Sequence, residues 1–220
     1  MVTKLIVWDF DGTLVDSRPQ IEAGMSHALG LLELGPEVQG EWLQYVGLPV
    51  RDGIERTFQP LGLTFEEVYP VYRSFDWQGT EHLLRPFPGV SELLAELHAL
   101  EVRMAIASSK RGEPLRRQAA LWGWQDFFDP IITPDEVGES TKPHPESLVQ
   151  ALEAHAVRPG EALMVGDTPF DLEMAQRAGV PSLAVTHGFY DQVALEAWSP
   201  VACVSDAEGL RRELLARVRR

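Results

Sequence analysis

The segment KLIVWDFDGTLVDS, residues 4–17, places two carboxylates two positions apart where an apolar run ends. Asp9 follows LIVW directly, and Asp11 stands just beyond it. A carboxylate with a reference pKa of about 3.9 is ionised at neutral pH, so it needs no base to act as a nucleophile. A second acid past the sharp turn is placed to move a proton. Asp9 is therefore a candidate nucleophile and Asp11 a candidate general acid and base.

Three more polar clusters stand near the ends of other apolar runs. Ser108 and Ser109 follow VRMAIA, Lys142 lies in ESTKPHP, and Asp167 and Asp171 lie in VGDTPFD. In an open parallel sheet, ligands bind beyond the carboxyl ends of the strands. We therefore expect the four clusters to face one crevice, with Lys142 entering from a loop that leads to a helix.

Three aspartates in this crevice, Asp9, Asp11 and Asp167, would repel one another and take up protons unless a cation compensates them. Hard oxygen ligands with few other donors suit Mg²⁺. Lys142 and Ser108 supply donors for an anion, and Ser109 is a further candidate. These groups predict a site for phosphoryl chemistry.

The dipeptide Gly12-Thr13 adds to this prediction, because backbone N–H groups at a tight turn can form a nest for an anion. We therefore count Gly12 and Thr13 among the candidate phosphate-binding residues.

The elements that must position these side chains alternate along the chain. Runs of strand length lie at 4–8, 102–107, 130–132, 162–166, 182–185 and 201–204. Amphipathic helical patterns lie at 89–100, 146–156, 170–179 and 208–218. This alternation predicts an α/β protein with a Rossmann-like parallel sheet covered on both faces.

The segment between the first and second clusters interrupts this pattern, because it contains no good strand. Helical patterns lie at about 18–33, 37–46, 50–60 and 64–78, and RPFPGV (85–90) is typical of a junction. We predict a helical cap domain, residues 17–83, inserted into a core domain of residues 1–16 and 84–220.

The motifs DFDGTLVDS, IASSK, TKPHP and VGDTPFD, in this order and spacing, resemble the four motifs of the haloacid dehalogenase superfamily. The match spans essentially the whole chain, and the helical insert is similar to a type-1 cap. The segments LVDSRPQIEAGMSHAL, VGLPVRDGIERTF and THGFYDQ resemble phosphoglycolate-phosphatase-like members.

This resemblance implies a phosphatase of small phosphorylated metabolites, with 2-phosphoglycolate as the first substrate to test. It implies Asp9 as the nucleophile that forms an aspartyl-phosphate, with Asp11 as general acid and base. It also implies Ser108 and Lys142 as phosphate ligands.

The resemblance implies a metal site as well. Mg²⁺ would be held by Asp9, the backbone carbonyl of Asp11, and Asp167. Asp171 would support Lys142 or a metal-bound water from behind the ligands.

Other functions stay open at this point. A phosphomutase or phosphotransferase on sugar phosphates is disfavoured by Ile21, because mutase relatives usually carry histidine there. Dehalogenases of the superfamily lack an acid at the position of Asp11. A non-catalytic binding protein on the same fold is a further alternative.

Two groups near the motifs receive lesser roles. Arg51, in GLPVRDG of the insert, is a candidate contact for a substrate carboxylate. Lys110 and Arg111, after the serine pair, are expected to be solvated surface residues.

Composition narrows the partners. The net charge of −14 argues against nucleic acid, because phosphate contacts need a basic face. No apolar run has the length of about 18 residues that a membrane span needs. The lone Cys203 suits a reducing cytoplasm. We expect a cytoplasmic monomer or homodimer that binds neither membranes nor nucleic acid.

Overall fold

A six-stranded parallel sheet forms the centre of the computed structural model, which describes residues 2–218. The strand order is β5-β4-β1-β6-β7-β8, so that β1 lies between β4 and β6. The strands are β1 Leu5–Trp8, β4 Arg103–Ala107, β5 Ile131–Ile132, β6 Ala162–Gly166, β7 Ser182–Val185 and β8 Cys203–Val204. The predicted parallel sheet is confirmed, although β5 and β8 are shorter than the apolar runs that predicted them.

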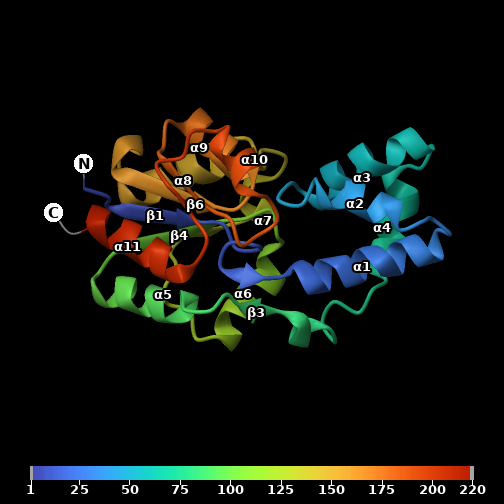
Figure 1. The fold of residues 1–220 in the computed structure, drawn as a ribbon, viewed down its shortest axis with the longest axis horizontal. Coiled ribbons are helices and arrows are strands. Elements are labelled where there is room, and N and C mark those ends of the chain that lie inside the picture. The colour runs from blue at the N-terminus through green and yellow to red at the C-terminus, as the bar shows by residue number, and fades with distance from the viewer. Residues whose placement is uncertain (1, 219–220) are drawn as a thin grey trace.

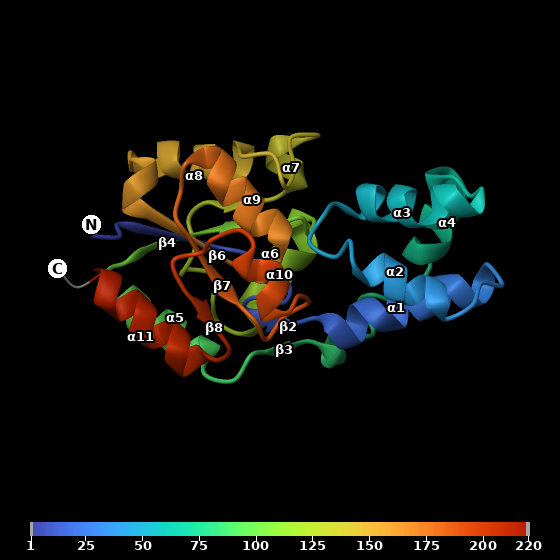
Figure 2. The same ribbon diagram turned by 45° about the horizontal axis from the view of Figure 1, so that its top comes forward.

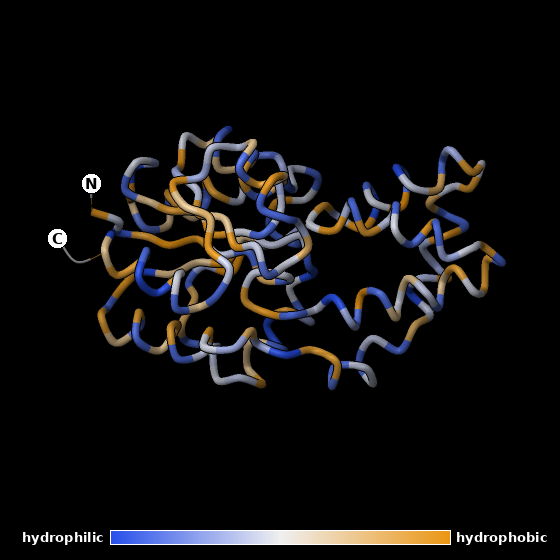
Figure 3. Tube along the Cα trace, in the orientation of Figure 1, coloured by the Kyte–Doolittle hydropathy of each residue, from blue (hydrophilic) through white to orange (hydrophobic). Residues whose placement is uncertain are grey.

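Helices cover both faces of this sheet, as Figures 1 and 2 show. Because side chains alternate along a strand, Ile6 and Trp8 of β1 face one layer while Leu5 and Val7 face the other. The first layer contains α5 (Val90–Ala99), α6 (Gly112–Leu121) and α11 (Ala207–Val218). The second contains α8 (Glu146–His155) and α9 (Pro169–Ala178). Figure 3 shows the apolar trace of β1 running between the layers.

Three helices of the core were not predicted. They are α6, together with the short helices α7 (Pro134–Val137) and α10 (Gln192–Glu196). Single 3₁₀ turns occupy η1 Gln59–Leu61, η2 Glu81–Leu83 and η3 Pro159–Glu161. Among the helices of residues 2–218, none is both long and apolar enough to cross a membrane.

The four α-helices within residues 18–73 form a separate group with an apolar cluster of its own. They are α1 (Arg18–Leu31), α2 (Glu37–Leu43), α3 (Val50–Phe58) and α4 (Phe65–Arg73). Trp42 stacks edge-on against Phe58 at 4.9 Å and lies 5.2 Å from Tyr72, so aromatic packing joins three of these helices. In Figure 1 the group lies to one side of the sheet, beyond the carboxyl ends of its central strands.

Two short strands connect this helical group to the core. Strand β2 (Val15–Asp16) leaves the core and β3 (Arg85–Pro86) returns to it. They pair antiparallel, with Val15 opposite Pro86 and Asp16 opposite Arg85. The sequence indicated a junction at 85–90, but not that the segments before and after the helical group pair as two short strands. The wider division into residues 17–83 and the remainder stays a prediction.

Candidate active site

The polar clusters of three motifs lie at the ends of three neighbouring strands. Asp9 follows β1, Ser108 follows β4 and Asp167 follows β6. Because these strands are parallel and adjacent, the three side chains leave the same edge of the sheet. All three are buried.

Lys142 joins this edge from the loop between α7 and α8, where it is only 2% exposed. Its Nζ lies 2.5 Å from Asp9 Oδ1 and 2.6 Å from Asp171 Oδ1. Burial raises the pKa of Asp9 to about 7, against the opposing effect of Lys142. Burial alone would lower the pKa of Lys142, but the charges of Asp171 and Asp9 outweigh it and raise that pKa.

Asp167 is held by groups from two other loops. The Thr13 hydroxyl donates to its Oδ1 at 2.9 Å, and the Phe189 backbone N–H donates to its Oδ2 at 2.8 Å. Burial raises the pKa of Asp167 well above its ordinary value, and Asp9 and Asp171 raise it further. Gly12 passes so close that a Cβ on it would lie 2.3 Å from Asp167 Oδ2, at a φ of +87°. The turn after β1 is thus shaped around this carboxylate.

Asp171 takes its position from the start of α9. The Asp171 carboxylate accepts hydrogen bonds from the Thr168 backbone N–H at 3.1 Å and hydroxyl at 2.8 Å, which form a capping box. One of its oxygens therefore caps the helix while the other faces Lys142. The sequence VGDTPFD contains this cap, since Thr168 precedes the helix and Asp171 is its third residue.

Among residues 2–218, Asp9, Asp167 and Asp171 form a group that could share a metal ion, because each offers a carboxylate oxygen within 4.8 Å of the others. Burial raises the pKa of Asp9 and of Asp167, because it disfavours the charged form. Repulsion from the neighbouring carboxylates raises both pKa values further. Three oxygen donors of one sign fit a hard divalent cation such as Mg²⁺.

The side chain of Asp11 points to a different partner. Its two carboxylate oxygens lie 3.0 and 3.1 Å from Lys110 Nζ. The Lys110 side chain is 15% exposed and lies 5.6 Å from the centre of the Phe10 ring. The expectation that Lys110 is solvated is therefore wrong, whereas Arg111 is exposed as expected.

Two of the predicted phosphate-binding groups already have partners within the protein. The Gly12 N–H donates to the Val15 carbonyl at 2.8 Å, so this amide closes the turn instead of pointing into an anion nest. The Ser109 hydroxyl donates to the Gly47 carbonyl at 2.7 Å, in the loop 44–49 between α2 and α3. Ser108, by contrast, keeps a buried hydroxyl beside the site, which accepts the Lys110 N–H at 3.2 Å.

Arg51 of the helical insert pairs with carboxylates of its own neighbourhood. Its guanidinium lies 3.1 Å from Glu55 Oε1 and 3.7 Å from Glu66 Oε1. It also lies over the ring of Phe65 at 3.8 Å. The guanidinium of Arg51 therefore pairs within α3 and α4 and does not contact the buried aspartates.

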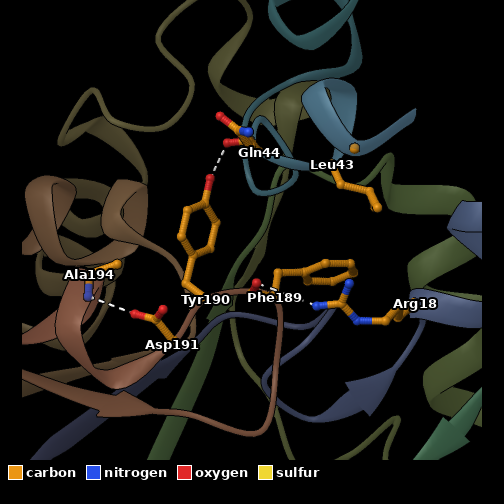
Figure 4. Close-up of a pocket in the computed structure, with 8 residues that line it drawn as sticks. Arg18, Leu43, Gln44, Phe189, Tyr190, Asp191 and Ala194 are labelled. Carbon is orange, nitrogen blue, oxygen red and sulfur yellow. Dashed lines mark hydrogen bonds between the residues drawn. The ribbon is translucent and has the colours of Figure 1, made fainter. Parts of the chain in front are cut away.

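A cavity of about 270 Å³ lies beside the site, between the helical group and the loop after β7. Figure 4 shows Arg18, Phe189 and Tyr190 on its wall. The Tyr190 hydroxyl donates to the Gln44 carbonyl, and Arg18 donates to the Phe189 carbonyl at 3.4 Å. The loop that holds Asp167 through Phe189 is thus also tied to the helical group.

The sequence did not indicate two members of this site, the ammonium of Lys110 and the backbone N–H of Phe189. Thr13 was predicted as a phosphate-binding residue, but the contact of its hydroxyl with Asp167 was not predicted. The signal for Lys110 was its place two residues after Ser108 in the same loop. A backbone N–H leaves no signal in the residue type.

The α/β core thus places an ammonium group among buried aspartates at its strand ends, an arrangement whose donors could hold an anion and a divalent cation. The model of the haloacid dehalogenase-like hydrolase family matches residues 6–185. The chain belongs to that family.

Relatives and solved structures agree with this assignment. The pyrophosphatase PpaX of Bacillus cereus (strain B4264) is 31% identical over 201 residues, which cover 91% of each chain. A predicted phosphatase from Clostridium acetobutylicum superposes with a TM-score of 0.86 at 20% identity, covering 98% of this chain and 100% of that one. A predicted phosphoglycolate phosphatase from Haemophilus somnus has a TM-score of 0.80 at 24% identity, covering 96% and 98%. At these identities, the two structures show a shared fold. The predictions of the superfamily, the fold and a hydrolase of the phosphatase class are confirmed.

Proposed function

We propose that this protein is a Mg²⁺-dependent phosphatase that hydrolyses a small phosphorylated metabolite through a phosphorylated Asp9. The observation that carries the proposal is the convergence of Asp9, Asp167, Asp171 and Lys142 at one buried edge of the sheet. One lysine among three buried carboxylates leaves a surplus of negative charge, which a divalent cation would neutralise so that an anionic phosphate ester can bind.

The donors fit Mg²⁺, because buried carboxylate oxygens are the ligands that this ion prefers. Asp9 and Asp167 would hold it, with the backbone carbonyl of Asp11 that the family resemblance adds. When bound, Mg²⁺ neutralises charge on the transferring phosphoryl oxygens. Thr13 and Phe189 fix the orientation of Asp167 for this task, since they hydrogen-bond to both of its oxygens.

The protein's own groups divide the two steps of hydrolysis among them. An oxygen of Asp9 attacks phosphorus, and the bond from phosphorus to the leaving oxygen breaks as Asp11 gives that oxygen a proton. In the second step Asp11 takes a proton from water, which attacks the phosphorus and frees Asp9 and inorganic phosphate. Lys142 and Ser108 bind the phosphoryl oxygens throughout, and Asp171 holds Lys142 in place.

The substrate proposal has two members. The family resemblance favours 2-phosphoglycolate, and the name of the PpaX relatives adds inorganic pyrophosphate.

We further propose that residues 17–83 act as a cap that shuts out water, because their loop 44–49 already contacts the core at Ser109. We also propose that the protein is a cytoplasmic monomer or homodimer without nucleic-acid or membrane partners. Its net charge of −14 disfavours nucleic acid, and its single cysteine suits a reducing compartment.

The test is phosphate release from a panel of phosphorylated metabolites with Mg²⁺. Asp9→Asn should lower turnover on the order of a thousandfold or more, because it removes the nucleophile. Asp126→Asn, on an exposed loop of the core, is the matched control and should keep wild-type activity. EDTA should abolish release, and rapid quenching should trap phosphate on Asp9.

Full activity of Asp9→Asn or full activity in EDTA would refute the proposal. A phosphotransferase is separated by product analysis, since substrate would then disappear faster than inorganic phosphate accumulates.

A further inference from the structure

Two of the three lysines in the chain contact the two aspartates of the DFD motif. Lys142 lies 2.5 Å from Asp9, and Lys110 lies 3.0 Å from Asp11. The third, Lys4, pairs with Glu161 at the opposite end of β1. In a chain of net charge −14, this placement concentrates the ammonium groups where an anionic substrate would lie.

The two lysines face different halves of a substrate. In the proposed reaction Asp9 attacks phosphorus from one side, and Asp11 protonates the oxygen that departs on the other. Lys142 is therefore next to the transferring phosphoryl group. Lys110, beside Asp11, is next to whatever the departing oxygen carries.

The environment of Lys110 is suited to recognition. Its side chain is 15% exposed, so the ammonium is accessible from the site yet shielded from bulk water. The loop after β4 fixes its backbone, because its N–H donates to Ser108 Oγ. The Phe10 ring lies 5.6 Å from its Nζ. A shielded cation attracts an anion more strongly than an exposed one does.

Arg51, which was the expected contact for a substrate carboxylate, is paired with Glu55 and Glu66 within the helical group, whereas the partner of Lys110 is Asp11 of the DFD motif. We infer that Lys110 takes this role and that it binds a second anionic group on the leaving half of the substrate. The inference rests on the proposed function and specifies its substrate class. Preferred substrates are phosphate esters or anhydrides whose leaving group bears a carboxylate or a further phosphate.

The experiment compares kcat/KM for three substrates, 2-phosphoglycolate, inorganic pyrophosphate and ethyl phosphate. Ethyl phosphate replaces the carboxylate of 2-phosphoglycolate by a methyl group, so the pair isolates the second charge. A charged hydrogen bond corresponds to about 10- to 100-fold in affinity. Lys110→Met should lower the ratio of kcat/KM for an anionic substrate over ethyl phosphate by that factor.

Two further variants complete the design. Lys110→Arg keeps the charge and should retain most of the ratio, which separates recognition from a folding defect. Lys4→Met removes the lysine at the far end of β1 and should leave the ratio unchanged. The anionic substrate whose kcat/KM falls more in Lys110→Met identifies the second group as carboxylate or phosphate.

The outcomes separate the inference from the proposed function. Equal losses on all three substrates in Lys110→Met would show that the residue acts only through Asp11 and would overturn the inference. The same follows if the wild type hydrolyses ethyl phosphate as well as the anionic substrates. Release of phosphate from none of the three by the wild type would instead count against the proposed function.

Discussion

Removal of the Lys142 ammonium should destabilise the folded protein in a way that depends on pH. The side chain is 2% exposed and lies between Asp9 and Asp171, both buried. Lys142→Met leaves these acids without their cation, and loss of one partner of a buried ion pair costs about 3–5 kcal/mol. The variant should show this loss in the metal-free protein at alkaline pH.

The pH dependence follows from the Asp9 carboxyl. Its pKa is about 7 in the wild type, raised from 3.8 by burial although Lys142 lowers it. A raised pKa in the folded state means that stability is lost as pH rises from the unfolded value to the folded one. In the wild type this loss ends near pH 7. Without Lys142 the pKa lies higher, so the folded variant holds an extra proton above pH 7 and its stability continues to fall.

The magnitude is about 1.4 kcal/mol for each pH unit per proton. Between pH 7 and pH 9, the difference in unfolding free energy between wild type and Lys142→Met should grow by about 3 kcal/mol. Urea unfolding followed by tryptophan fluorescence, in EDTA from pH 6 to pH 9, measures it.

Lys4→Met is the matched control. Lys4 is 55% exposed, and hydrogen bonds from Arg158 and Lys4 lower the pKa of its partner Glu161 to about 2. That acid is therefore ionised across the whole range, and the control should show no change with pH. A difference for Lys142→Met that is equal at pH 7 and pH 9 would refute the reasoning.

Three further predictions concern the metal and the cap. Gly12→Ala places a Cβ 2.3 Å from Asp167 Oδ2 and should weaken Mg²⁺ binding about 10- to 100-fold, as measured by calorimetry. Gly30→Ala is the control, because a Cβ there meets open space. Equal Mg²⁺ affinities of the two variants would contradict the prediction. Because the pKa of Asp9 is about 7 and that of Asp167 is raised, Mg²⁺ affinity should fall below pH 7 and Mg²⁺ binding should release protons. Identical heats of Mg²⁺ binding in buffers of different ionisation enthalpy would exclude this proton release. Ser109→Ala removes a hydrogen bond to the loop 44–49, whose amide exchange should become about fivefold faster; unchanged exchange there would show that the contact does not restrain the cap.

Much of the sheet and its edge could be predicted from the sequence, because local patterns specify them. Four apolar residues in a row at 5–8 indicate a central strand, and the residues after parallel strands must share an edge of the sheet. The convergence of Asp9 and Asp167 follows from topology, since β1 and β6 are neighbours. Residue spacing and fold rules sufficed here.

Helix α6 escaped prediction for a local reason. Its sequence GEPLRRQAAL begins with glycine and contains Pro114, both unfavourable inside a helix. Pro114 lies in the first turn, where a proline is tolerated because the amide there has no helical partner. The helical pattern of residues 112–121 was therefore too weak to predict the helix that the structure shows.

The partners of Ser109 and Lys110 depend on how distant segments meet. Gly47 is 62 positions from Ser109, and Asp11 is 99 positions from Lys110. Both serines follow β4, yet the buried Ser108 hydroxyl accepts the Lys110 N–H, whereas the Ser109 hydroxyl donates to the helical group. No local periodicity distinguishes these orientations, so tertiary structure was needed to assign them.

Ser108, Ser109 and Lys110 are consecutive, and each has different surroundings: Ser108 is buried at the end of β4, Ser109 donates to the loop 44–49, and Lys110 pairs with Asp11. A single inserted or deleted residue there would turn all three side chains away from their partners at once. This connection should therefore tolerate exchange of side chains but not a change of length. Engineering of specificity would accordingly proceed by substitution within the tripeptide, while the exposed turn after α6 offers room for added residues.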